Sequence, residues 1–458
     1  PKPIYYFLIP ILAVRLLSVF VVQTWYVPDE YWQTLEVAHK YAFGYGALTW
    51  EWQKGIRSYF YPSVVAAIYY VLKFTGLDYP EAVIFLPRIL QALISTAADY
   101  SFYKWTGNRK WALFLILTSW FWFYTSGRTL LQTLETSLVM VALSIFPFKN
   151  TRLSYYSPAV LCVFIRPTSA PLWAVLGGYN LITTNQGRLR LVITGGALVA
   201  LDSYFHGSLV VTPWEFFRFN VLYDIASYYG THPWHWYLSQ GLPAVLGINL
   251  LPVLWAITTV VRRPREHPIG VLLLVAAVTH VALYSFIPHK EFRFVLPLLP
   301  IFLYLAQDVI VPWSRKATKW QLYALAGAIL VGNSVPALYF GAVHQAGTVK
   351  VMPLLRDALP NNRSSHKLCL VWGQMALCVM SYDIYFILSC FQHYSVNRLL
   401  YNVFDKCIWE FWRERRNSRV APLYFFPKLV FCRVFMHKKR WCFIHKVPNH
   451  KRECRKII

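Results

Sequence analysis

Long runs of apolar residues recur along this chain and constrain its fold more than any other feature. The first run, Ile4 to Val27, has the roughly 20 residues that a helix needs to cross the hydrocarbon core of a bilayer. Hydrophobic residues make up 57% of the 458 residues, charged residues make up 14%, and the mean hydropathy is +0.39. This composition is typical of membrane proteins, so we predict an all-α polytopic membrane protein.

The net charge of +25 could indicate one of two environments. In a soluble protein, such an excess of basic residues would favour a nucleic-acid partner. Here the basic residues fall mainly in short loops between apolar runs and in the last quarter of the chain. The positive-inside rule accounts for the loops, so we expect a membrane environment and no nucleic acid.

The basic loops predict a topology of about eleven membrane spans when alternate clusters are placed in the cytosol. The expected spans are 4–27, 79–102, 111–124, 129–145, 153–165, 172–182, 191–205, 242–261, 268–287, 295–311 and 322–340. The apolar run 62–74 is left out, because counting it would invert every later basic cluster. We expect residues 58–75 to form an interfacial or re-entrant helix. The first luminal loop then extends from residue 28 to about residue 77.

Two adjacent carboxylates, Asp29 and Glu30, follow the first predicted span directly. Charges kept at a membrane boundary often serve a function. Alternatively, the pair marks the start of a solvated helix, with Pro28 in an early position and both acids favourable to the helix dipole. Taken alone, the segment supports the two interpretations equally.

The rest of the first loop is rich in groups suited to a sugar site. Carboxylates orient and deprotonate hydroxyl groups, aromatic rings stack on the faces of sugars, and arginine pairs with phosphate. Side chains of these kinds are Asp29, Glu30, Trp32, Gln33, Glu36, His39, Trp50, Glu51, Trp52 and Arg57. The loop therefore favours a sugar-binding site, with an arginine able to pair with a phosphate.

Four segments give the chain a family resemblance. Residues 28–36 (PDEYWQTLE), 44–52 (GYGALTWEW) and 56–59 (IRSY) resemble the dolichol-phosphate-mannose-dependent mannosyltransferases of the GT-C class, glycosyltransferase family 22. Residues 289–294 (HKEFRF) are similar to the H-K-E-x-R-F motif of that family. The resemblance covers about residues 8–360 and implies a GT-C fold, a multi-pass location in the endoplasmic reticulum membrane and a luminal active site.

Within the family, residues 33–36, 48–52 and 228–237 most resemble the branch that adds the third mannose, in α-1,2 linkage, to the glycosylphosphatidylinositol (GPI) precursor. The resemblance thus implies dolichyl phosphate mannose as donor and the GPI-precursor glycolipid as acceptor. It implies no tightly bound cofactor, and it leaves the metal requirement and protein partners open. The sequence contains no nucleotide-sugar loop and no Asp-x-Asp motif. This absence fits a lipid-linked donor.

A single inverting displacement needs a base for the acceptor hydroxyl and cations for the leaving phosphate. We expect Asp29 to be the base, with Glu30 as a second candidate or as a sugar-orienting partner. The cations expected at the donor phosphate are His289, Lys290 and Arg293, with Glu291 holding them in place. The expected substrate-binding residues are Trp32, Gln33, Glu36, Trp50, Glu51, Arg57, Arg128 and Glu291.

Some basic groups have alternative interpretations. The 289–294 segment could form a positive collar at a membrane boundary, although such collars are expected on the cytosolic side and the topology places this one in the lumen. Arg128 and Arg166 are equally consistent with structural and donor-site roles. His232 and His235 could suggest a metal, but Pro233 breaks helical geometry between them and no third ligand stands close.

The composition changes near residue 366. Of the eight cysteines, only Cys162 precedes this point, and basic residues far outnumber acidic ones after it. The Met-Pro-Cys-His-type motif usual in the family is not found after His366. We therefore expect a GT-C transmembrane catalytic domain over 1–365. We expect 366–458 to be an atypical basic, Cys-rich tail, such as one from an alternative reading frame, rather than a new domain.

Other functions stay open beside the predicted one. A related mannosyltransferase of N-glycan lipid-linked oligosaccharide assembly would carry similar motifs. A polytopic transporter or scramblase would also have many spans and buried cations, but it should contain internal repeats with broken helices at matched positions, which this sequence lacks. A noncatalytic subunit of a glycosylation complex is the third alternative.

Overall fold

The computed structural model describes residues 5–107, 109–148, 155–184, 188–350, 434–437 and 440–443. The chain divides into two units, Pro1–Tyr382 and Asp383–Ile458. In the second unit, β1 (Val434–His437) and β2 (Arg440–Phe443) form an antiparallel hairpin. Apart from this hairpin, the predicted tail from residue 366 lies outside the described residues, and its proposed boundary stays a prediction.

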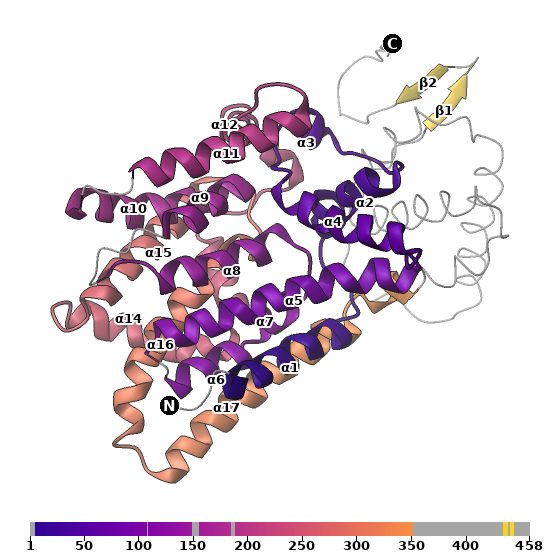
Figure 1. Cartoon of the computed structure of the whole chain (residues 1–458). Coiled ribbons are helices and arrows are strands. Elements are labelled where there is room, and N and C mark those ends of the chain that lie inside the picture. Colours follow the sequence, from indigo (N-terminus) through magenta and orange to yellow (C-terminus); the bar gives the residue numbers. More distant parts are fainter. Residues whose placement is uncertain are drawn as a thin grey trace. The chain divides into compact units, whose positions relative to one another are not determined.

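All the described elements of the first unit are helical (Figure 1). The α-helices are α1 (Tyr5–Val21), α2 (Glu36–Phe43), α3 (Trp50–Gln53), α4 (Phe60–Thr75), α5 (Pro80–Trp105), α6 (Lys110–Thr118), α7 (Trp120–Thr125), α8 (Leu131–Ser144), α9 (Tyr156–Ile165), α10 (Ala170–Thr184), α11 (Arg188–His206), α12 (Thr212–Phe217), α13 (Leu242–Leu246), α14 (Leu250–Arg262), α15 (Pro268–Phe286), α16 (Leu299–Ser314) and α17 (Lys319–Leu338). Short 3₁₀ and π turns are η1 (Tyr31–Leu35), η3 (Pro167–Ser169), η4 (Arg218–Leu222), η5 (Ile225–Tyr229), η6 (Tyr237–Gly241), η7 (Gly247–Asn249), η8 (Phe292–Leu298) and η9 (Tyr339–Val343).

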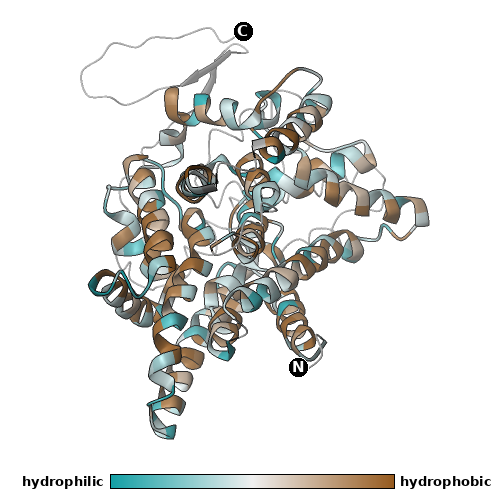
Figure 2. Cartoon of the chain, turned by 60° about the vertical axis from the view of Figure 1, so that its left-hand side comes forward, coloured by the Kyte–Doolittle hydropathy of each residue, from teal (hydrophilic) through white to brown (hydrophobic). Residues whose placement is uncertain are grey.

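Hydrophobic residues run along most of these helices (Figure 2), as a protein surrounded by lipid requires. Five continuous helical stretches are long and apolar enough to cross a membrane: Pro80–Trp105, Tyr237–Arg262, Pro268–Phe286, Phe292–Ser314 and Lys319–Lys350. Four shorter apolar helices are Tyr5–Val21, Phe60–Thr75, Leu131–Ser144 and Tyr156–Ile165. The structure thus confirms a helical protein with several candidate spans, and it does not confirm the count of eleven.

The expected span 111–124 is not one helix. It breaks at Ser119, whose ψ of 115° ends α6, and α7 starts at the next residue. The backbone amide of Trp120 donates a hydrogen bond to Oδ1 of Asn333 in α17, over 3.3 Å. A buried amide needs such a partner when its helix is interrupted. The expected span thus consists of two helices, and the break could not be expected from the sequence because the side chain that stabilises it, Asn333, lies far away in the chain.

A buried ion pair joins α1 to α5, which lie side by side (Figure 1). Arg15 Nε donates to Oδ2 of Asp99 over 2.5 Å, and both side chains are 0% exposed. Trp122 of α7 donates its indole N–H to the other oxygen of Asp99 over 2.8 Å. Arg15 also donates to the carbonyl of Ile116 over 3.1 Å. These bonds fix the helix that leads into the acidic pair.

Replacement of Asp99 tests this ion pair. The Asp99→Asn variant leaves the Arg15 guanidinium as a buried charge without its counter-ion, which should cost about 3–5 kcal/mol of stability. We expect a clearly lower midpoint of thermal unfolding for the detergent-solubilised protein.

The matched control is the exposed pair of Arg263 and Glu266, 3.5 Å apart with both side chains more than 60% exposed. The Glu266→Gln variant should shift stability by no more than about 0.5 kcal/mol. Equal shifts for the two variants would contradict the structural role of Asp99.

Candidate active site

The acidic pair lies at the start of a helical stretch that runs from Asp29 to Phe43. The carbonyl of Pro28 accepts hydrogen bonds from the amides of Tyr31 and Trp32, over 3.0 and 3.1 Å. The structure therefore shows a helix start here, although Glu30 is buried rather than solvated. The two carboxylates nevertheless leave the helix start in different directions, into two different ion pairs.

Asp29 links the first loop to the 289–294 segment. Its Oδ2 lies 2.6 Å from Nη1 of Arg293 and accepts a hydrogen bond from Nε2 of Gln33, also over 2.6 Å. Its side chain is 23% exposed. Asp29 is thus held in place by two groups while remaining accessible to a small molecule.

Glu30 is almost completely buried, with its side chain 4% exposed. Arg128 donates from Nη1 to Oε2 of Glu30 over 2.9 Å and from Nη2 to the carbonyl of Thr24 over 2.8 Å. Burial is the largest single influence on the pKa of Arg128 and acts to lower it, but the charge of Glu30, its hydrogen bond and the nearby tyrosines together raise that pKa. Both residues, predicted for the site, lie in a buried ion pair that fixes the start of the loop.

Glu291 collects the cations of the 289–294 segment. It accepts bonds from Nε and Nη2 of Arg293, over 2.7 and 2.5 Å, and its Oε1 lies 3.0 Å from Nε2 of His289. Burial acts to raise the pKa of Glu291, but Arg293 and His289 outweigh it and hold that pKa well below its usual range. Glu291 therefore stays ionised and orients the same guanidinium that contacts Asp29.

Lys290 points elsewhere. Its Nζ donates to the backbone carbonyls of Ile287 and His232, over 2.6 and 3.0 Å. Burial lowers the pKa of the Lys290 ammonium. The structure therefore brings His289 and Arg293 together at Glu291 and gives Lys290 a place against the backbone.

Gln33 connects Asp29 to the remainder of the first loop. While its amide nitrogen donates to Asp29, the same nitrogen lies 3.4 Å from Oε2 of Glu51. Glu51 in turn forms an ion pair with Arg57 over 2.6 Å. The amide oxygen of Gln33 accepts from Nη1 of Arg166 over 3.4 Å.

Three buried arginines meet around this network: Arg57, Arg166 and Arg293. Burial, followed by the nearby charges of Arg57 and Arg293, lowers the pKa of Arg166 to about 10. Among the described residues, Nε and Nη1 of Arg57 and Nε of Arg166 find no hydrogen-bond partner. Buried donors of this kind are costly without an acceptor, and a phosphate would supply several. The cluster is therefore suited to bind an anion.

Sequence reasoning left Arg166 open between a structural and a donor-site role, and the structure places it among the other two arginines. Its charge is partly balanced by Glu135 of α8, to which the hydroxyl of Ser169 donates a hydrogen bond. The signal available in the sequence was the position of Arg166 at the end of a predicted span. Its partners could not be inferred from that position.

The remaining predicted residues have structural contacts. Glu36 accepts a hydrogen bond from the amide of Ala47 over 2.9 Å, which holds the turn before α3. The indole of Trp50 donates to the hydroxyl of Tyr229 over 3.1 Å. The carbonyl of Trp32 accepts from the indole of Trp52 over 3.1 Å.

In the part of the chain that the structure describes, no group of three or more His, Cys, Asp or Glu side chains is arranged to hold a metal ion. His235 Nδ1 lies 3.2 Å from the hydroxyl of Ser239. Burial, followed by the charges of His289 and Lys290, lowers the pKa of His232.

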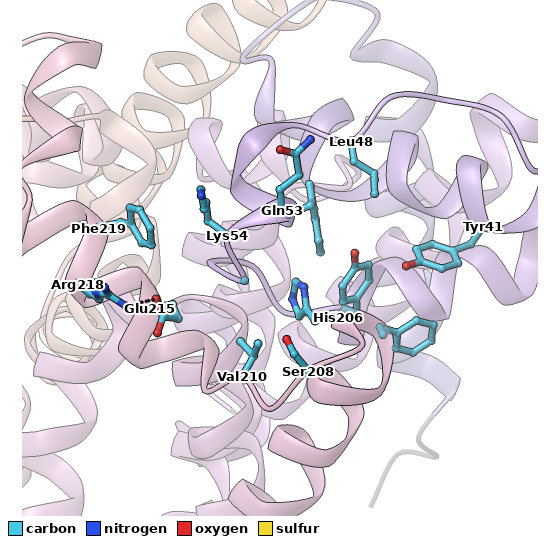
Figure 3. A pocket seen from close by; sticks show the side chains of 14 residues that line it. Tyr41, Leu48, Gln53, Lys54, His206, Ser208, Val210, Glu215, Arg218 and Phe219 are labelled. Atoms are coloured by element: carbon cyan, nitrogen blue, oxygen red, sulfur yellow. Dashed lines mark ion pairs between the residues drawn. The ribbon is translucent and has the colours of Figure 1, made fainter.

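A cavity of about 540 Å³ is lined by residues of the first loop, of α11 and of α12 (Figure 3). Among the residues that line it are Gln53, Lys54 and His206. Neither Asp29 nor Arg293 is among its lining residues. The site thus has two distinct parts, a network of charges and an open hollow.

Residues 6–382 match the Alg9-like mannosyltransferase family. The chain belongs to that family. A relative named GPI mannosyltransferase 3, from Drosophila melanogaster, is 51% identical over 365 residues, which are 78% of this chain and 65% of that protein. GPI alpha-1,2-mannosyltransferase 3 from Danio rerio is 39% identical over 77% of this chain and 67% of its own length. The human protein of the same name is 36% identical over 78% and 66%.

The chain thus spans about two thirds of the length of these relatives. Among solved structures, the crystal structure of ArnT from Cupriavidus metallidurans bound to undecaprenyl phosphate resembles it with a TM-score of 0.50 and 17% identity. The likeness covers 84% of this chain and 76% of that one. It shows a shared fold and confirms the predicted GT-C architecture in outline.

We expect this protein to bind an isoprenyl phosphate at the cluster of Arg57, Arg166 and Arg293. Farnesyl phosphate at 100 times its Kd should stabilise the purified protein by about 2.7 kcal/mol. The Arg166→Gln variant removes one charged donor, so its affinity should fall at least about 10-fold. The measurement is the shift of the thermal midpoint with ligand concentration.

The exposed Arg315 provides the control variant, Arg315→Gln, which should bind like the parent protein. Farnesol, which lacks the phosphate, should give little stabilisation to any of the three proteins. An undiminished shift in Arg166→Gln would remove this residue from the anion site.

Proposed function

We propose that this chain transfers mannose from dolichyl phosphate mannose to the GPI-precursor glycolipid, adding the third mannose in α-1,2 linkage. The names of its relatives support the reaction and the acceptor. The observation that carries the proposal is the position of Asp29, an accessible carboxylate fixed beside a cluster of buried arginines. We also propose an endoplasmic reticulum location, with this site in the lumen.

In the proposed reaction, Asp29 is the base. Its Oδ2 is engaged by Arg293 and Gln33, whereas its Oδ1 accepts no hydrogen bond from the described residues. That oxygen takes the proton of the acceptor hydroxyl as the hydroxyl oxygen attacks the anomeric carbon of mannose. The carbon–oxygen bond to phosphate breaks in the same step, and the product has the inverted configuration.

The leaving dolichyl phosphate departs with negative charge, which cations placed in advance can stabilise. We assign this part to Arg57 and Arg166, whose unpartnered N–H groups can donate to phosphate oxygens. Arg293 completes the positive field and keeps Asp29 oriented. No step requires a tightly bound cofactor, and none is assigned to a metal.

Glu30 has a different part in this proposal. Its burial and its ion pair with Arg128 leave it no contact with an acceptor. We therefore assign it to holding the loop that presents Asp29. Two neighbouring carboxylates thus take separate roles, because only one of them is accessible.

The chain can be tested by complementation of cells that lack GPI mannosyltransferase 3. We expect the parent chain to restore surface GPI-anchored proteins and to deplete the two-mannose precursor. The Asp29→Asn variant should reduce turnover by about 10²–10⁴-fold, the usual contribution of a general base. Microsomal transfer of radiolabelled mannose measures this directly.

Asp78→Asn is the matched control, because Asp78 is an exposed carboxylate outside the network. It should support full rescue at an equal protein level. Rescue by Asp29→Asn would show that another group is the base. Failure of a well-expressed parent, together with consumption of N-glycan precursors in the same cells, would show that the acceptor is wrong.

A further inference from the structure

The cavity lined by the first loop, α11 and α12 has the features of a sugar-binding site. Its volume of about 540 Å³ is in the range of small-molecule sites. Trp52 and Tyr59, 2% and 3% exposed, contribute aromatic rings to its lining. Gln53 and Lys54 lie on the side of α3 and the loop after it, and His206 and Ser208 lie on the α11–α12 side (Figure 3). The hollow thus combines aromatic rings with several hydrogen-bonding groups.

A second, smaller cavity of about 150 Å³ adjoins the first. The two share Tyr41, Tyr59 and Phe205 in their linings. Beyond these rings, the smaller cavity is lined by Ser63, Ala66, Ala67 and Tyr70, so it is mainly apolar. A polar hollow that continues into an apolar one suits an amphiphilic ligand, with a sugar headgroup and a hydrocarbon chain.

Exposed apolar side chains are next in sequence to residues that line the cavities. Tyr204 and Leu209 are 81% and 85% exposed, on the segment that also supplies His206 and Ser208 to the larger cavity. Such side chains are unfavourable in water and favourable in contact with lipid. A ligand whose chain lies in the bilayer could therefore place its headgroup in the cavity.

One segment of the first loop borders both the cavity and the charge network. Glu51 and Arg57, at its two ends, take part in the network through Gln33 and the ion pair between them. Gln53 and Lys54, between those ends, line the cavity. The donor phosphate is assigned to the arginines, none of which is among the described lining residues of either cavity. The cavity is thus left for the other substrate.

We propose that the two cavities form the binding site of the acceptor glycolipid, with the glycan in the larger cavity and the start of the lipid in the smaller. This inference rests on the proposed function for its two-substrate reaction. It adds Gln53 and Lys54 as acceptor-contacting residues. Because the 51–57 segment contacts both the cavity and the network, an acceptor held in the cavity would extend its reacting mannose past this segment to Asp29.

Asp202 keeps the walls of this site in register. Its Oδ1 accepts from the hydroxyl of Ser58 and the amide of Tyr59, each over 2.9 Å. Its Oδ2 accepts from the hydroxyl of Thr212 over 2.9 Å. Through these bonds Asp202, which lies in α11, connects the first loop to α12. Its side chain is fully buried, so we assign it no contact with a ligand. The cavity is in this way held open before a ligand binds.

Protection of a cysteine tests the site without relying on turnover. Gln53→Cys in the full chain, in microsomal membranes, is treated with a maleimide, and the labelled peptide is quantified by mass spectrometry. The purified two-mannose GPI precursor should slow labelling at least about 5-fold at a concentration ten times its Kd. Dolichyl phosphate should leave the rate unchanged. Lys316→Cys, an exposed position outside both cavities, is the control and should not be protected.

Kinetics provide the second readout. Lys54→Ala should raise the KM for the acceptor about 10-fold while leaving the KM for the donor and kcat within about 2-fold. Lys316→Ala should match the parent. An unchanged acceptor KM together with no cysteine protection would overturn the inference, and so would protection by dolichyl phosphate alone.

The same experiment separates this inference from the proposed function. Protection by an N-glycan lipid-linked precursor, and not by the GPI precursor, would support an acceptor site and refute the proposed acceptor. Turnover of the GPI precursor without protection of the Gln53→Cys variant would support the function and refute the site. A lack of both turnover and protection would refute both.

Discussion

The candidate site depends on the ion pair between Asp29 and Arg293. This pair joins two segments that lie far apart in the sequence. Arg293 is almost completely buried and has two carboxylate partners, Asp29 and Glu291. A buried cation of this kind is tolerable only when it is paired in good geometry. Arg293 therefore balances one carboxylate from each of the two segments and holds them together.

Two further buried ion pairs hold the first loop and the helix that leads into it. Arg15 with Asp99 fixes α1 against α5, and Glu30 with Arg128 fixes the chain where it leaves α1. The arginine cluster has the opposite character, since buried N–H groups of Arg57 and Arg166 lack partners among the described residues. The ion pairs thus hold the first loop in place, whereas these N–H groups of Arg57 and Arg166 remain available to a phosphate.

Sequence reasoning predicted the helices well where their signal was local. The expected spans 79–102 and 268–287 correspond to α5 (Pro80–Trp105) and α15 (Pro268–Phe286). The break at Ser119 was not predictable, because Asn333 in a distant helix satisfies the freed amide. Within the site, the motifs indicated Asp29, Arg57 and Arg293. They could not distinguish the accessible Asp29 from the buried Glu30, or reveal that Gln33 bridges Asp29 to Arg166.

A double-mutant cycle between Asp29 and Glu291 tests the central claim, that these two carboxylates act through one shared guanidinium. kcat/KM for mannosyl transfer is measured for Asp29→Asn, Glu291→Gln and the double variant, at equal amounts of folded protein. If Arg293 couples them, the double variant should be within about 3-fold of the slower single variant. If the two losses multiply instead, the carboxylates act independently, and the account of a site organised by Arg293 is wrong.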